Sequence, residues 1–133
     1  MLLDDTNALI WAEIADPRLG ENAKQRLDTA LKSGEAFICP ISFWEVQLAI
    51  DRRRLVLQTA VELWRANLLA GGYVERPITG IDTILMAKLA DFHADPADRL
   101  FVAVAINAGF ELITSDQKIL DWAGQLERVD ARR

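Results

Sequence analysis

Four acidic side chains stand where the pattern of short apolar runs would bring them to one edge of a β-sheet. They are separated by 40, 53 and 18 residues, and they are Asp5, Glu45, Asp98 and Asp116. In an open α/β sheet, ligands gather where strands deliver their carboxyl ends to the N-termini of helices. Four carboxylates that converge there repel one another and lose hydration, unless a hard divalent cation lies among them. Their convergence therefore indicates a metal site.

Each acid taken alone also has a purely structural explanation. Glu45 lies three residues after Ser42, which is the spacing of a capping box. Asp98 and Asp116 fall in the first turns of predicted helices, where the helix dipole favours negative charge. Only the convergence of all four acids at one edge of the sheet indicates a bound cation.

The side chains available as ligands limit which cation could bind and which reaction it could support. Oxygen ligands suit Mg²⁺ or Mn²⁺, whereas zinc, copper and iron prefer imidazole and thiolate. The chain has one cysteine, Cys39, in an apolar run that indicates packing. Its one histidine, His93, we interpret as solvated or as a local hydrogen-bond partner, with a substrate contact as the alternative. No Gly-rich phosphate loop or Gly-x-Ser-x-Gly elbow occurs, so nucleotide binding and serine hydrolysis are unsupported. Of the reactions considered, metal-assisted attack on a phosphodiester is the one that these residues support.

The elements that must position these acids are short apolar runs that alternate with stretches of helical period. The runs predict strands at residues 1–5, 35–40, 73–78, 111–114 and 127–130. The intervening patterns predict helices at residues 7–15, 21–32, 43–53, 60–70, 81–91, 96–108 and 117–122. Parallel strands need crossovers, and both faces of such a sheet need cover. We therefore expect one domain over residues 1–133, an α/β/α sandwich with a central, mostly parallel sheet of four or five strands.

Local signals mark several ends of the predicted helices. Thr79 and Asp82 have capping-box spacing, and Asp95 precedes a proline at a predicted first helical position. Glycines at positions 34, 71 and 109 follow three predicted helices, where glycine commonly ends a helix.

Composition limits the classes of protein and of partner. The chain of 133 residues carries 15 Lys and Arg against 20 Asp and Glu, a formal charge of −5. This balance argues against nucleic-acid binding through a broad basic surface, so a phosphate substrate would need a cation as mediator. No apolar run is long enough to cross a bilayer, and Asp4 and Asp5 stand where a signal peptide would carry positive charge, so we expect a cytoplasmic protein.

The order of four short motifs resembles the PIN-domain ribonucleases, and among them the VapC-like toxins of type II toxin–antitoxin systems. The motifs are Leu2-Leu3-Asp4-Asp5-Thr6-Asn7-Ala8-Leu9, Ser42-Phe43-Trp44-Glu45-Val46, Asp95-Pro96-Ala97-Asp98-Arg99 and Ile113-Thr114-Ser115-Asp116. The resemblance implies a PIN-like fold, endoribonuclease activity with Mg²⁺ or Mn²⁺, and inhibition by a cognate small antitoxin. It makes Asp5, Glu45, Asp98 and Asp116 the catalytic metal ligands.

Supporting roles follow from the same motifs. Thr6, Asn7 and Thr114 match supporting polar positions of the family, Asp95 and Arg99 flank the third acid, and Ser115 is a further candidate to orient ligands or substrate. The chain departs from the family at Asp4, where an apolar residue is usual before the first aspartate. Adjacent strand residues point to opposite faces, so one of Asp4 and Asp5 can face the metal. The Thr6-Asn7 pair favours Asp5, with Asp4 as the alternative.

A predicted helical hairpin at residues 43–70 carries more apolar area than one helix needs to cover a sheet. It either fills the core of its own domain or offers a partner surface. With the resemblance, this surplus predicts a homodimer and an antitoxin segment that crosses the hairpin toward the acids. We expect Arg52, Arg53 and Arg54 to be solvated, with contacts to RNA phosphates as the alternative.

Two other functions compete with the nuclease. A receiver-like domain or aspartyl phosphotransferase also gathers acids and Mg²⁺ at the end of a parallel sheet, but the run from Asp4 to Asn7 lacks alternate aspartates, and Lys118 lies beside an acid that the metal site already uses. An inactive PIN-like interaction module would keep the fold without the chemistry. The presence of all four acids argues against it, because buried acids without partners are costly.

Overall fold

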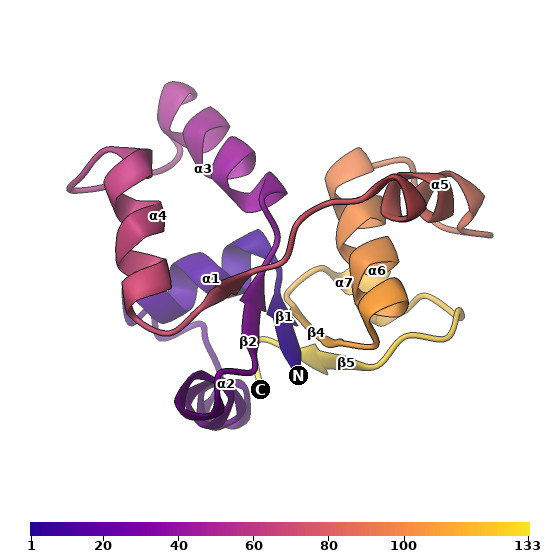
Figure 1. Cartoon of the computed structure of the whole chain (residues 1–133), viewed down its shortest axis with the longest axis horizontal. Coiled ribbons are helices and arrows are strands. Elements are labelled where there is room, and N and C mark those ends of the chain that lie inside the picture. The colour runs from indigo at the N-terminus through magenta and orange to yellow at the C-terminus, as the bar shows by residue number, and fades with distance from the viewer.

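Five parallel strands form one sheet in the computed structural model, which describes residues 1–133 (Figure 1). The strands are β1 (Leu2–Asp4), β2 (Ala36–Ile38), β3 (Val74–Glu75), β4 (Glu111–Thr114) and β5 (Arg128–Asp130). The helices are α1 (Thr6–Glu13), α2 (Glu21–Ser33), α3 (Ile41–Asp51), α4 (Val61–Ala70), α5 (Gly80–Lys88), α6 (Pro96–Ala108) and α7 (Gln117–Leu120). The strand order is β3-β2-β1-β4-β5 and every pairing is parallel, so the predicted α/β/α fold is confirmed.

Alternate residues of the central strands point into two separate cores, because successive side chains of a strand face opposite sides. Leu2 and Ile113 pack with residues of α1, α2, α3 and α4 on one side. Leu3 and Leu112 pack with α6 and α7 on the other, a core that also holds Cys39. In Figure 1 the first group of helices and the group of α5, α6 and α7 lie on opposite sides of the strands. Cys39 is buried there as the predicted packing residue.

Most of the predicted helix ends are confirmed. Gly34 and Gly109 take φ values of 72° and 69° after α2 and α6, a left-handed conformation that suits glycine. Asp95 caps α6 before Pro96, and Thr79 and Asp82 form both hydrogen bonds of a capping box at the start of α5.

The capping box predicted at Ser42 is wrong. Helix α3 begins at Ile41, its N-cap is Pro40, and no side chain caps it. Ser42 is instead buried inside the helix, with its Oγ 3.0 Å from Thr6 Oγ1. The helix therefore starts two residues earlier than the box requires. This leaves Glu45 free to make a tertiary contact.

Helices α3 and α4 form the predicted hairpin, which both fills the core and exposes apolar surface. Trp64 and Leu68 of α4 are buried against the sheet side of the hairpin, and the Phe43 ring meets Trp64 edge-on at 6.0 Å between centroids. Trp44 and Leu63, in contrast, are 58% and 52% exposed. No helix has the length and apolar character needed to cross a membrane.

Candidate active site

Asp5 lies at the junction of β1 and α1, where it caps the helix. Its Oδ1 accepts the Ala8 backbone N–H at 2.8 Å. Its Oδ2 accepts the Thr114 hydroxyl at 2.6 Å and the Ser115 backbone N–H at 3.1 Å, both from the end of β4. These three donors fix the orientation of a carboxylate that is almost fully buried.

Asp4 points to the opposite face of the sheet. Its Oδ2 accepts the Tyr73 hydroxyl at 3.2 Å, and its buried Oδ1 has no hydrogen-bond partner. Burial raises the pKa of Asp4 to about 8, with a smaller contribution from the nearby charges of Asp5 and Glu13. Asp4 therefore belongs to the core on the α1 side, and Asp5 is the acid that faces the pocket described below.

Glu45 reaches the same region from the first turns of α3. Thr6 donates its hydroxyl to Glu45 Oε1 at 2.5 Å, and Thr6 also contacts Ser42. Burial raises the pKa of Glu45, and the negative charges of Asp95 and Asp5 raise it further. Helix α1 thus links the first acid to the second through Thr6.

Asp98 and Asp116 complete the group from α6 and α7. Asp95 holds the start of α6 by accepting the backbone N–H groups of Ala97 and Asp98 at 2.9 and 3.2 Å. Asp116 caps α7 by accepting the N–H groups of Lys118 and Ile119 at 2.8 and 3.2 Å. Both acids therefore sit at helix N-termini, as their positions in the sequence indicated.

The four predicted acids meet around one pocket of about 550 Å³. Of the predicted supporting residues, Thr6, Asn7 and Asp95 also line it, whereas Arg99, Thr114 and Ser115 do not. Two further lining residues, Arg52 and Arg54, had been named as alternative contacts to RNA phosphates. The rest of the wall lies outside the predicted site and consists of Ile10, Trp44, Leu48, Ala49, Pro96, Ala97 and Phe101. Five of these residues, Arg52 and Arg54 included, lie on or just after α3, and the others lie on α1 and α6. The rotation and packing of these helices decide that they face the acids, and no local pattern in the sequence reveals it.

The electrostatics of the pocket resist full ionisation of its acids. Burial, followed by the charges of Asp116, Asp95 and Glu45, raises the pKa of Asp98 to about 8. Burial also raises the pKa of Asp5, although its hydrogen bonds to Thr114 and two backbone N–H groups oppose the shift. A bound cation would favour the ionised forms and relieve this repulsion.

His93 lies closer to the acids than its polar loop suggested. Its Nε2 is 3.3 Å from Asp98 Oδ2, and its Nδ1 accepts the Asp95 backbone N–H at 3.4 Å. One potential ligand atom from each of His93, Asp98 and Asp116 lies within 4.8 Å of the other two. The ring stacks on Phe92, with 4.5 Å between centroids.

Arg99 acts through the loop between α5 and α6 rather than through the pocket. Its guanidinium donates to three backbone carbonyls, those of His93, Met86 and Phe92, at 2.9, 2.8 and 2.8 Å. These bonds hold the loop that carries His93 beside α6.

Asn7 and Ser115 provide a second link between α1 and β4. Asn7 Nδ2 donates to Ser115 Oγ at 3.4 Å, and the Ser115 backbone N–H binds Asp5. The predicted supporting residues therefore hold the acids, or the segments that carry them, in place.

Solved structures share this fold at low sequence identity. VapBC2 from Rickettsia felis, bound to a DNA fragment from its promoter, aligns with a TM-score of 0.69 and 16% identity over 97% of this chain and 98% of the other. A toxin–antitoxin complex from Klebsiella pneumoniae aligns with a TM-score of 0.66 and 22% identity, covering 98% of each chain. At these identities the likeness shows the fold alone.

Sequence comparison identifies the family. Ribonuclease VapC22 of Mycobacterium tuberculosis is 27% identical over 118 residues, which cover 89% of this chain and 88% of that protein. The family model described as PIN domain matches residues 2–124, which is nearly the whole chain and includes the four predicted acids of the pocket. This chain belongs to the PIN domain family.

Proposed function

We propose that this protein is an endoribonuclease that depends on Mg²⁺ or Mn²⁺ and is the toxin of a toxin–antitoxin pair. The observation that carries the proposal is the meeting of Asp5, Glu45, Asp98 and Asp116 around one pocket, with raised pKa values for three of them. The ribonuclease relative and the toxin–antitoxin structures of the same fold support the biological role.

The residues of the pocket fit a hard divalent cation. Carboxylate oxygens are the ligands that Mg²⁺ and Mn²⁺ prefer. Burial and the repulsion between the acids raise the pKa of Asp98, and a cation would offset this repulsion. Asp5, Glu45, Asp98 and Asp116 would hold one or two such ions directly or through water. When bound, the cation lowers the pKa of water and offsets charge on the phosphate oxygens.

The side chains around the acids then have separate tasks. Thr114 and the Ser115 backbone N–H orient Asp5, and Thr6 orients Glu45, so that these ligands are held before substrate binds. We assign to Glu45 the further task of accepting the proton from the attacking water, because its carboxylate lines the pocket beside the other acids and Thr6 orients it. His93 stands where it could hold Asp98 Oδ2 from the loop side.

A cognate small antitoxin and a second copy of the chain are the proposed protein partners, and RNA in the cytoplasm is the proposed substrate. The exposed Val56 and Leu63 leave apolar surface on the helical hairpin. The acidic pocket would accept a Lys or Arg of the antitoxin, which would take the place of the cation. Light scattering at micromolar concentration tests the dimer, and co-expression with a small protein encoded beside the gene tests the antitoxin.

The decisive experiment is cleavage of total RNA by the antitoxin-free protein. Asp98→Asn keeps the shape of the side chain but removes its charge, and we expect activity to fall by roughly 10- to 100-fold or more, as loss of groups that support a metal commonly does. Excess EDTA should abolish cleavage. The matched control is Asp121→Asn, the same change at an exposed residue outside the pocket. Cleavage at the wild-type rate by Asp98→Asn, or in EDTA, would refute the proposed chemistry.

A further inference from the structure

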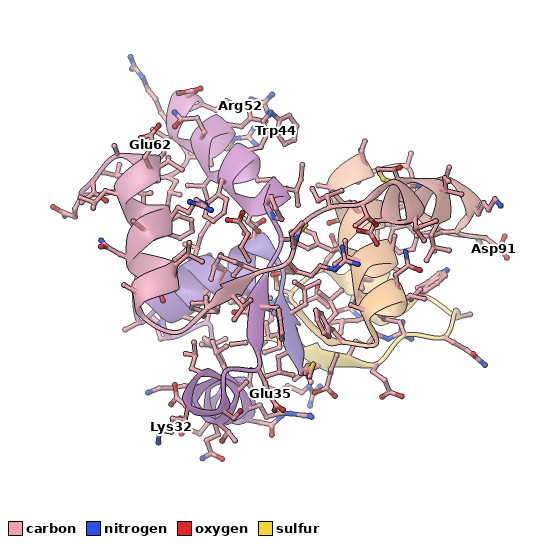
Figure 2. The ribbon with its side chains drawn as sticks, in the orientation of Figure 1. Lys32, Glu35, Trp44, Arg52, Glu62 and Asp91 are labelled. Atoms are coloured by element: carbon pink, nitrogen blue, oxygen red, sulfur yellow. The ribbon has the colours of Figure 1, made fainter.

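The wall of the pocket opposite Asp98 and Asp116 is formed by one face of α3. Trp44, Glu45, Leu48, Ala49 and Arg52 all line the pocket, and their spacing of one, four, five and eight residues is that of a single helical face. Arg54 extends this wall just beyond the helix. Figure 2 shows Trp44 and Arg52 projecting from α3 on the side away from α4.

The charge of this wall changes from negative to positive along the helix. Glu45 belongs to the acidic end, and Arg52 follows it by seven residues, which corresponds to about 10 Å along the helix axis. The pocket therefore joins an acidic end to a basic end. An extended polyanion with repeated phosphates could meet a cation at the first end and guanidinium groups at the second.

The two arginines of the wall are not engaged elsewhere in the molecule. Neither Arg52 nor Arg54 takes part in an ion pair or in a side-chain hydrogen bond, whereas Arg76 and Arg99 are held by partners within the fold. Both are exposed, so their guanidinium groups are available to a ligand of the pocket.

Trp44 is also available to a ligand. It is 58% exposed, whereas Trp11 and Trp64 are buried and Trp122 donates its indole N–H to Ala90 O at 2.9 Å. A large exposed ring beside the acids offers a flat surface on which an unpaired base can stack, and such stacking accepts any base.

We propose that this wall, defined by Trp44, Arg52 and Arg54, binds the single-stranded segment of RNA that flanks the cleaved bond. Trp44 stacks on a base next to that bond, and Arg52 and Arg54 contact phosphates farther along the strand. The assignment rests on the proposed nuclease function for its location. It adds that the substrate is unpaired where it crosses α3, because a base within a duplex cannot stack on the ring.

A peptide segment is the other class of occupant for this wall. The two exposed arginines favour the polyanion, because guanidinium groups without a partner in the fold are free to bind phosphate oxygens. RNA is therefore the occupant that the wall fits, and peptide binding is the alternative outcome of the test.

The test measures binding of a labelled single-stranded RNA of mixed sequence to the full chain by fluorescence anisotropy, with Ca²⁺ in place of Mg²⁺ and the RNA checked for integrity on gels. An abasic strand and a duplex of equal length serve as comparison ligands. We expect Trp44→Ala to weaken single-strand binding by roughly 5- to 150-fold, the range for loss of one stacked base, and Trp44→Phe to retain most of it. The abasic strand should bind wild type and Trp44→Ala alike.

The arginine contacts are tested by the dependence of binding on salt. Each lost phosphate contact should lower the slope of log affinity against log salt by about 0.7 for a single strand, so Arg52→Gln should bind with a smaller slope. Arg53→Gln removes the same charge from a neighbouring exposed position outside the pocket and should leave the slope unchanged. Leu63→Ala is the control for loss of an exposed apolar side chain on the same hairpin.

Unchanged RNA binding by Trp44→Ala and Arg52→Gln would overturn the inference, as would a loss by Trp44→Ala that is equally large on the abasic strand. Loss of binding to a co-expressed antitoxin with full RNA binding retained would assign the wall to a peptide and also overturn it. These outcomes leave the proposed nuclease standing if Asp98→Asn still lowers RNA cleavage and EDTA still abolishes it. If wild type binds RNA through this wall but cleaves none with Mg²⁺ or Mn²⁺, the proposed chemistry fails and the binding site remains.

Discussion

The replacement Asp4→Asn should stabilise the protein, and more so as pH rises. Asp4 is buried in the central strand, its pKa is raised to about 8, and only Tyr73 donates a hydrogen bond to it. In the unfolded chain an aspartate ionises near pH 4. Between these values the folded state holds a proton that the unfolded state releases, so stability is full below about pH 4 and is lost as pH rises toward 8.

The size of the effect follows from the same two values. Each pH unit in this interval costs about 1.4 kcal/mol of unfolding free energy, so at pH 7 the cost from Asp4 is on the order of 4 kcal/mol. An asparagine does not ionise and avoids this cost. With the entropy of unfolding usual for a chain of 133 residues, each kcal/mol corresponds to a shift in Tm of about 3–4 °C.

The assay is urea denaturation of wild type and Asp4→Asn at pH 5, 6, 7 and 8, with EDTA present so that metal binding does not contribute. Other buried acids titrate in both proteins, so the difference between the two curves isolates Asp4. We expect that difference to grow by roughly 2–3 kcal/mol from pH 5 to pH 7 in favour of asparagine. Asp121→Asn, at an exposed position, should follow wild type. A difference that stays constant from pH 5 to pH 8 would refute the reasoning.

Two further predictions concern Arg99 and Cys39, on the side of the sheet that α6 and α7 cover. Arg99→Gln removes the guanidinium that binds three backbone carbonyls. We expect the free energy of unfolding to fall by roughly 2–4 kcal/mol and hydrogen exchange over residues 86–93 to become faster. Exchange at the wild-type rate in this segment would show that Arg99 does not hold the loop. Burial raises the pKa of Cys39 to about 11, so its thiol should resist a disulfide reagent in the folded protein at pH 8 and react fully in denaturing urea; rapid reaction of the native protein would contradict its place in the core.

Features that depend on neighbouring residues were predictable from the sequence. The alternation of short apolar runs with helical patterns gave the order of all five strands and seven helices, because strand and helix periods are local. Gly34 and Gly109 end helices in a left-handed conformation that other residues adopt at a cost, and Asp95 before Pro96 caps α6.

The meeting of the four acids was also predictable, although they are far apart in the chain. Parallel strands deliver their carboxyl ends to one edge of a sheet, so acids that follow β1, β2 and β4 converge there with the acid that opens α6. The period of a strand then separates Asp4 from Asp5, and the residues after Asp5 indicated which one faces the pocket. The order of the parallel strands and the two-residue period of a strand together determine which acids meet in the pocket.

Only the tertiary structure decided which side chains surround the acids. Ser42 has the spacing of a capping box, yet the turn at Pro40 starts α3 earlier and places Ser42 against Thr6. His93 reaches Asp98 because Arg99 fixes the loop between two helices.

The sequence alone also did not reveal which residues of α3 face the pocket or which residue binds Asp4. Trp44 and Arg52 face the pocket because the opposite side of α3 packs on α4, and Tyr73 meets Asp4 across a separation of 69 residues. The sequence by itself determined the elements, their order and the edge of the sheet where the acids gather, since these follow from local periods and the geometry of parallel strands. The rotation of each helix and the path of each loop depend on packing between distant residues, and they decided what lies beside those acids.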